Sequence, residues 1–127
     1  MLNDPVISIL EKAASGASLR HEAILNNISN VNTPGYKRVD IDFKTELSNI
    51  TKQMGQSNQS EIDKKIKSIR PEVIRESDTS VRPDGNNVDI DREMSLLAEN
   101  ALEYNLYISL LSKKVEGLLS VINEGRR

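Results

Sequence analysis

Apolar residues recur at alternating steps of four and three along the last third of the chain. They form a heptad seam made of Ile90, Met94, Leu97, Ala101, Tyr104, Ile108, Leu111, Val115, Leu118 and Ile122. An unbroken repeat of this kind is typical of a long helix that packs against other helices. Acidic residues open the segment and Gly125 follows it, as helix termini favour. The pattern predicts a helix over residues 90–123.

The start of the chain carries a weaker version of the same repeat. Its members are Ile7, Leu10, Ala14, Ala17, His21, Ile24, Ile28 and Val31. Asn3 or Asp4 can cap a helix here, with Pro5 at the first helical position, where its missing N–H costs nothing. Several members are alanines, so a partner backbone can approach closely. We predict a second long helix within residues 1–32, paired with the first.

The segment between the two helices has a different character. Thr33, Pro34, Gly35 and Tyr36 are typical of a type II turn, and Val39, Ile41 and Phe43 then alternate with charged residues, as in a short strand. On such a strand Asp40 and Asp42 would share the solvent face. Residues 72–75 and 80–82 are two further candidate strands.

Residues 48–69 are rich in Ser, Asn, Gln and Lys and show no helical period beyond a short stretch at 61–69. We interpret this region as mobile and leave the conformation of residues 47–82 open. The chain thus divides into an N-terminal helix (1–32), a central region of low order with a turn and short extended segments (33–87), and a C-terminal helix (88–127). The expected fold class is mainly α.

Composition narrows the functional classes. The 127 residues are 37% hydrophobic and 3% aromatic, which suits long apolar seams better than a deep pocket. There is no Cys and a single His, which excludes disulfides, thiol catalysis and a Cys/His zinc site. A net charge of −2 provides no field for nucleic acid, and no apolar run is long enough to insert into a membrane.

Candidate catalytic groups have simpler interpretations. His21 lies on the N-terminal seam, where a packed or interface histidine is expected. Asp89 and Asp91 fit the capping of the long helix. A calcium loop starting at Asp84 fails, because Val88 stands where an oxygen ligand is needed. We predict no enzyme and no cofactor.

The ten apolar side chains of the heptad seam are too many for the shorter first helix to cover. A hairpin of the two helices should therefore expose apolar surface, which usually marks a site of association. A coiled-coil homodimer and a subunit that stacks beside many others both fit this pattern.

The segment 26–38, in which Asn26, Asn27 and Asn30 lead into the turn at residues 33–36, resembles the N-terminal signature of bacterial flagellar rod and hook proteins. Segments 39–43 and 84–93 are similar to the corresponding segments of proximal-rod members of this family. Two proximal-rod proteins share the motif at 26–38. The resemblance covers roughly residues 1–46 and 83–123.

This resemblance implies a structural subunit of the hollow rod in the basal body. The terminal helices would pair as an antiparallel coiled coil and pack with neighbouring pairs into a tube. Implied partners are further copies of the chain, other rod proteins, the basal-body ring, an adaptor at the rod base and the flagellar export apparatus. Export to the periplasm would proceed without a cleaved signal peptide.

The resemblance also assigns roles to the N-terminal motif. The three asparagines would tie down the end of the first helix, the turn would direct the chain away from it, and the Tyr36 ring would pack over the junction. The alternative function is a self-contained coiled-coil adaptor or secretion chaperone, and an enzyme acting on the cell wall that the rod must cross is the least favoured alternative.

Overall fold

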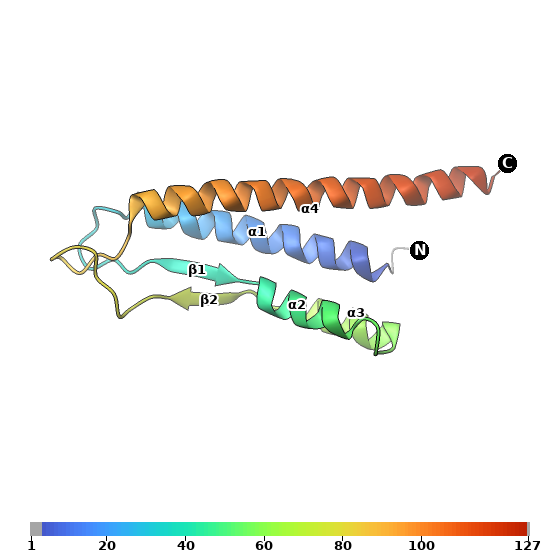
Figure 1. Ribbon diagram of the computed structural model, residues 1–127, viewed down its shortest axis with the longest axis horizontal. Helices are drawn as coiled ribbons and strands as arrows, with labels where there is room; N and C mark the ends of the chain where they lie inside the picture. The colour runs from blue at the N-terminus through green and yellow to red at the C-terminus, as the bar shows by residue number, and fades with distance from the viewer. Residues whose placement is uncertain (1–3, 127) are drawn as a thin grey trace.

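The computed structural model describes residues 4–126 as an elongated, mainly helical molecule (Figure 1). Its elements, in chain order, are α1 (Pro5–Ser29), β1 (Val39–Asp42), α2 (Lys44–Gln53), α3 (Gln59–Ser68), β2 (Glu72–Arg75) and α4 (Ile90–Glu124). Helix α1 lies in the middle, with α4 along one side and the remaining elements along the other. The predicted fold class, with two long terminal helices packed together, is confirmed.

Helix α1 begins where the sequence predicted. The Asp4 side chain accepts a hydrogen bond from the Val6 amide at 2.9 Å, with Pro5 at the first helical position. The other candidate cap, Asn3, lies outside the described residues. Every member of the predicted N-terminal seam is buried or half-buried, because α1 is covered on two sides. Its alanines allow both neighbours to approach the helix axis closely.

Helix α4 is capped by Asp89, whose carboxylate accepts from the Asp91 and Arg92 amides. Lys114 pairs with Asp4 at 3.1 Å, so the start of α1 lies opposite Lys114. The rest of α4 extends past α1 (Figure 1). Two polar residues, Glu93 and Asn100, are the buried residues of α4. The contact between the two long helices therefore includes buried polar side chains.

The heptad seam does not face α1 along its whole length. Four of its residues are half-buried, namely Leu97, Leu111, Leu118 and Ile122. The other six are exposed: Ile90, Met94, Ala101, Tyr104, Ile108 and Val115. Apolar surface thus remains on α4 after α1 has packed against it, as the sequence led us to expect.

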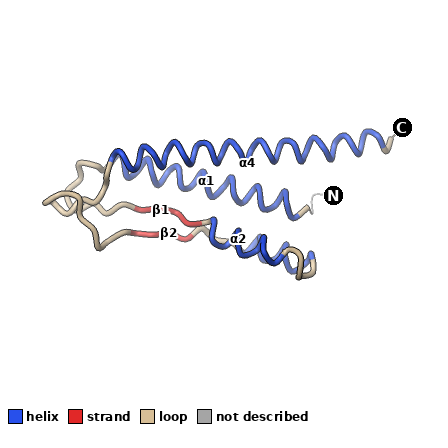
Figure 2. The backbone as a smooth tube through the Cα atoms, viewed as in Figure 1, coloured by secondary structure: helices blue, strands red, loops and turns tan. Residues whose placement is uncertain are grey.

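The central region is more regular than the sequence predicted. Helices α2 and α3 replace the expected mobile stretch, and only the helix near residues 61–69 was anticipated (Figure 2). Both helices bury apolar residues at helical spacing against α1. With α1 and the neighbouring loops they form a core cluster of Ala13, Ala17, Phe43, Leu47, Ile50, Ile62, Ile66 and Ile69. The apolar positions of these helices are separated by polar surface residues, so the helical repeat is weak in the sequence.

Strands β1 and β2 form an antiparallel pair in which Val39 is opposite Arg75 and Ile41 is opposite Val73. The strands predicted near 39–43 and 72–75 are confirmed, although Phe43 belongs to the start of α2. The strand predicted at 80–82 is wrong. The amides of Val81 and Arg82 instead donate to the Asn86 carbonyl in a compact loop.

Phe43 is held against α1 by a close approach at Gly16. A Cβ atom placed on Gly16 would lie 2.4 Å from the Phe43 Cγ atom. No side chain fits there, so the glycine lets the aromatic ring rest directly on the helix backbone. This contact connects the end of β1 and the start of α2 to the middle of α1.

Candidate functional site: a buried polar junction

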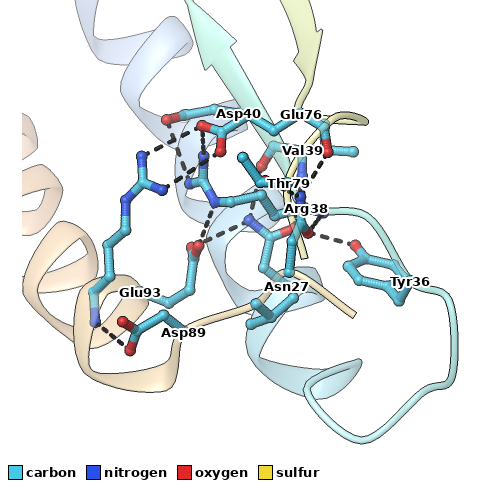
Figure 3. Close-up of polar contacts among 12 residues, drawn as sticks. Asn27, Tyr36, Arg38, Val39, Asp40, Glu76, Thr79, Asp89 and Glu93 are labelled. Carbon is cyan, nitrogen blue, oxygen red and sulfur yellow. Dashed lines mark hydrogen bonds and ion pairs between the residues drawn. The ribbon is translucent and has the colours of Figure 1, made fainter. Parts of the chain in front are cut away.

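The two sequence motifs, 26–38 and 84–93, meet at the end of the molecule where the loops lie (Figure 1), and Figure 3 shows polar contacts around this junction. The residues that bury polar side chains there are Asn27, Arg38, Asn86, Asn87 and Glu93, which we call the polar junction. They join the end of α1, the hairpin and the start of α4. Sequence reasoning assigned Asn27 to the end of the first helix and counted Glu93 among the acidic residues that open the long helix, but it assigned no role to Arg38, Asn86 or Asn87.

Asn27 uses its complete side-chain hydrogen-bonding capacity (Figure 3). Its Nδ2 donates to the Val39 carbonyl at 2.8 Å and to Glu93 Oε2 at 3.1 Å. Its Oδ1 accepts from the Val39 amide at 2.9 Å and from the Tyr36 hydroxyl at 3.2 Å. One buried amide therefore connects α1 to β1, to the turn and to α4.

Arg38 and Glu93 form a buried ion pair with a 2.5 Å separation between Nε and Oε1. The same guanidinium lies 2.8 Å from Glu76 and 3.6 Å from Asp40. Burial by itself would lower the pKa of Arg38, but the hydrogen bond and charge of Glu93, with the charges of Glu76 and Asp40, raise it above its ordinary value. Three carboxylates from different segments thus converge on one cation.

Asp40 was expected on a solvent face, and the structure corrects this. Its carboxylate pairs with the Arg20 guanidinium, with Nε and Oδ1 2.9 Å apart. Burial would raise the pKa of Asp40, but hydrogen bonds from Arg20 and the Ile41 amide, with the charges of Arg20 and Arg38, hold the pKa below its ordinary value. Asp40 is therefore an anchor between β1 and α1.

Asp42 accepts hydrogen bonds from the first turn of α2. Its carboxylate accepts from the Thr45 hydroxyl at 2.7 Å and from the Thr45 amide at 3.2 Å. These two hydrogen bonds lower the pKa of Asp42. The two acids of the predicted strand thus have different structural partners, and the structure gives neither a catalytic geometry.

Asn86 and Asn87 connect the second motif to the first. The Asn86 Nδ2 donates to the carbonyls of Asn30, Val31 and Thr33 at 2.8–3.1 Å. Asn87 accepts from the Arg38 amide at 2.6 Å and donates to the Glu76 carbonyl at 2.6 Å. Their one sequence signal is that they are adjacent asparagines directly after a glycine turn, a pattern that also fits an ordinary loop.

The turn after α1 has the predicted geometry. The Tyr36 amide donates to the Thr33 carbonyl at 3.2 Å, and Gly35 has φ of +72°, as a type II turn requires. The Gly35 amide also donates to the Asp84 carbonyl at 3.0 Å, so the turn contacts the second motif.

The three asparagines of the first motif have different functions. Asn30 Nδ2 donates to the Asn26 carbonyl at 2.8 Å, and the Asn30 backbone amide donates to the same carbonyl at 3.1 Å, so Asn30 closes the end of α1. Asn26 contributes that carbonyl while its side chain is exposed. Asn27 instead connects distant segments, which local spacing could not reveal.

His21 lines a shallow groove of about 200 Å³ between α1 and α4, next to Ser18, Asn100 and Tyr104. Among residues 4–126 no three His, Cys, Asp or Glu side chains are placed to hold a metal ion. No described helix combines the length and the apolar character needed to cross a bilayer. The polar junction is suited to fixing how the hairpin and the two long helices are joined.

Comparisons with known proteins find relatives over nearly the whole length of the chain. Residues 7–37, which include α1 and its turn, match the family described as flagella basal body rod protein. Flagellar basal body rod protein FlgB of Bacillus subtilis is 30% identical, over 94% of this chain and 95% of that protein. The proteins of the same name from Escherichia coli (31% identical, 96% of each chain) and Aeromonas hydrophila (32%, over 94% and 93%) are similar as well.

Proposed function

Since the chain belongs to the flagella basal body rod protein family, we propose that it polymerises through the exposed faces of α4 into the rod. It is a structural subunit of the flagellar basal body rod, an apparatus of motility, and not an enzyme.

The proposed contact surface rests on the apolar side chains that remain exposed on α4. Met94 is 52% exposed, and five other seam residues are exposed beside it. Leu102, Leu106 and Leu110 are also exposed and are spaced by four residues. The helical period places these three on a different side of α4 from the seam. Each apolar side chain contributes roughly 1.5–3 kcal/mol when fully buried.

Two apolar sides on one helix favour a stacked subunit over a simple dimer. A two-fold dimer covers a single patch on each copy, whereas a helical array covers two different patches. Helix α1 packs against a third side of α4, distinct from the seam side and from the side of Leu102, Leu106 and Leu110. A neighbour on each of the other sides would enclose α4 completely, as expected for a helix inside the wall of a tube.

We also propose where the subunit assembles and which components it contacts. The subunit would leave the cell interior through the flagellar export apparatus and assemble in the periplasm. There it would contact the basal-body ring, the adaptor at the rod base and other rod proteins, and form the part of the hollow shaft that leads to the distal rod and hook. Its family membership supports assembly with other flagellar components.

Electron microscopy of basal bodies tests the role as a whole. Particles would be purified from a strain that lacks only this gene and from the same strain carrying the gene on a plasmid. We expect rings without rods or hooks in the deletion strain, and complete structures after complementation. Complete rods in the deletion strain would contradict the proposed role.

The contact surface is tested with Met94→Asp and Leu106→Asp, both at exposed positions. A charge there would be buried without a partner in the assembled rod, so we expect stable protein but no rods. Ser48→Asp, at an exposed position of α2 away from α4, is the control and should assemble normally. Leu97 and Leu111 are less suitable test positions, because both are half-buried. Normal rods with both test variants would exclude α4 as the contact.

A further inference from the structure

The two outer edges of the β1–β2 hairpin differ in whether their backbone groups are hydrogen-bonded. On β1, the backbone groups of Val39 that face away from β2 are both bonded by the Asn27 side chain. The next outward amide, that of Ile41, donates to Asp40 Oδ1 at 2.8 Å. Side chains therefore occupy the edge of β1 in the way that a neighbouring strand would.

Among residues 4–126, no side chain bonds the outer edge of β2 in this way. The Glu76 amide donates to the Arg38 carbonyl at 3.2 Å, which sets the phase of the antiparallel ladder. Because residues of an antiparallel strand alternate between facing the partner and facing away, the N–H and C=O groups of Val73 and Arg75 point outward. All four residues of β2 are exposed. We call this side the β2 edge.

The side chains along the β2 edge are apolar at its centre. Val73 is 63% exposed and Ile74 is 42% exposed, on opposite faces of the strand. On the Val73 face, a groove of about 480 Å³ runs between the hairpin and α1, lined among others by Leu19, Ala23 and Ile41. An open edge beside an apolar groove provides both the backbone and the side-chain components of strand recognition.

We propose that the β2 edge binds an extended segment of another protein chain, which adds a third strand to the hairpin. The backbone of that segment would bond to Val73 and Arg75, and one apolar side chain would enter the groove. In the antiparallel orientation its charges would match those of β2. A basic residue would lie opposite Glu72 and an acidic one opposite Arg75, with two apolar residues between them.

A second copy of β2 is a poor occupant of this edge. Two-fold pairing that matches Val73 with Arg75 sets Glu72 against Glu76, which are like charges. Pairing Val73 with itself sets Arg75 against Pro71, which has no N–H to donate. Pairing Arg75 with itself opposes two cations. The charges of β2 and the proline before it therefore disfavour a second copy of β2 and favour a strand of different sequence.

The test uses the full chain and a synthetic peptide with the core Asp-Val-Val-Lys, flanked by Gly and Ser. Backbone amide shifts would be followed by NMR during titration. We expect shifts at Val73 and Arg75 and none at Lys52, an exposed residue of α2. A peptide with the core Lys-Val-Val-Asp should bind the Glu72→Lys/Arg75→Glu double variant better than the wild type. Absence of shifts at the highest soluble concentration of either peptide would overturn the proposal.

Val73→Pro and Val73→Thr form the matched pair of variants. Proline removes the outward N–H of Val73 but no bond to β1, whereas threonine keeps that N–H. Peptide shifts should vanish in the first and persist in the second. Equal binding by both variants would overturn the proposal, and so would a wild-type dimer in sedimentation that Val73→Pro abolishes, because the edge would then accept a second copy. The peptide titration does not involve the rod, so its failure is separate from a failure of the proposed function.

Discussion

The side-chain amide of Asn27 bonds both backbone groups of Val39, at 2.8 Å and 2.9 Å, and so takes the place of a third strand beside β1. The same amide donates to Glu93 on α4. A single residue near the end of α1 therefore positions the hairpin and the second long helix. Both consequences depend on an uncharged amide, which can donate and accept at once.

Asn27→Asp should destabilise the chain strongly. The carboxylate cannot donate to Val39 or Glu93, and it would place a second negative charge beside Glu93 in a buried site. We expect a loss of about 3 kcal/mol in the free energy of unfolding, measured with urea. Asn26→Asp is the control, because the Asn26 side chain is exposed one residue earlier. Equal effects at both positions would contradict the role of Asn27.

A double-mutant cycle tests the ion pair between Arg38 and Glu93. Arg38→Met leaves Glu93 buried without a cation, for which we expect a loss of about 3–5 kcal/mol. Glu93→Leu should cost less, because Arg38 keeps its contacts with Glu76 and Asp40. The double variant should lose much less than the sum of the two single variants, because no uncompensated charge remains at that contact. Additive losses in chemical denaturation would show that the pair is not coupled.

Gly16→Ala should destabilise the protein although alanine is the better helix former. The added Cβ would clash with the Phe43 ring, at a cost of about 1–3 kcal/mol, which exceeds the helix-propensity gain of about 1 kcal/mol. The control is Gly117→Ala in α4, where no atom lies within 4 Å of the new Cβ. That substitution should raise the melting temperature of the isolated chain, and Gly16→Ala should lower it.

Gly35→Val should weaken the turn through backbone strain. The residue has φ of +72°, and a Cβ there would meet no atom within 4 Å, so a steric clash is not the cause. We expect a loss of about 1–2 kcal/mol in thermal or urea unfolding, together with impaired rod assembly. Gly35→Asn should cost less, because asparagine tolerates positive φ. A larger loss for asparagine than for valine would contradict the turn assignment.

Acid should release the contact between Asp40 and Arg20. The pKa of Asp40 is lower in the folded chain than in the unfolded chain, so its stabilising effect is complete above the unfolded value of about 4. The effect is lost as the pH falls below that value through the folded pKa. The difference in melting temperature between the wild type and Asp40→Asn should therefore shrink between neutral pH and pH values below about 4. A constant difference would mean that the carboxylate charge is not responsible.

The sequence by itself determined the elements whose residues form one continuous pattern. The two terminal helices, the cap at Asp4, the turn at Gly35 and the strands near 39–43 and 72–75 follow from spacing and local backbone preference, which act over a few residues. Helix α2 was missed and α3 was anticipated only as a short helix at 61–69, because their few apolar residues are separated by polar ones. The family signature at 26–38 was also readable, since it is a contiguous string.

Only the tertiary structure decided which polar residues would be buried together. Nothing in local spacing shows that Asn27 contacts Val39, or that Arg38 reaches Glu93 across 55 positions of sequence. A charged residue near a helix start is normally solvated, and its burial is favourable only when a partner arrives from a distant segment. The open edge of β2 depends likewise on which strand α1 covers. Hydrophobic period identifies the inward side of one element, but the partners across a junction are set by how all the elements pack.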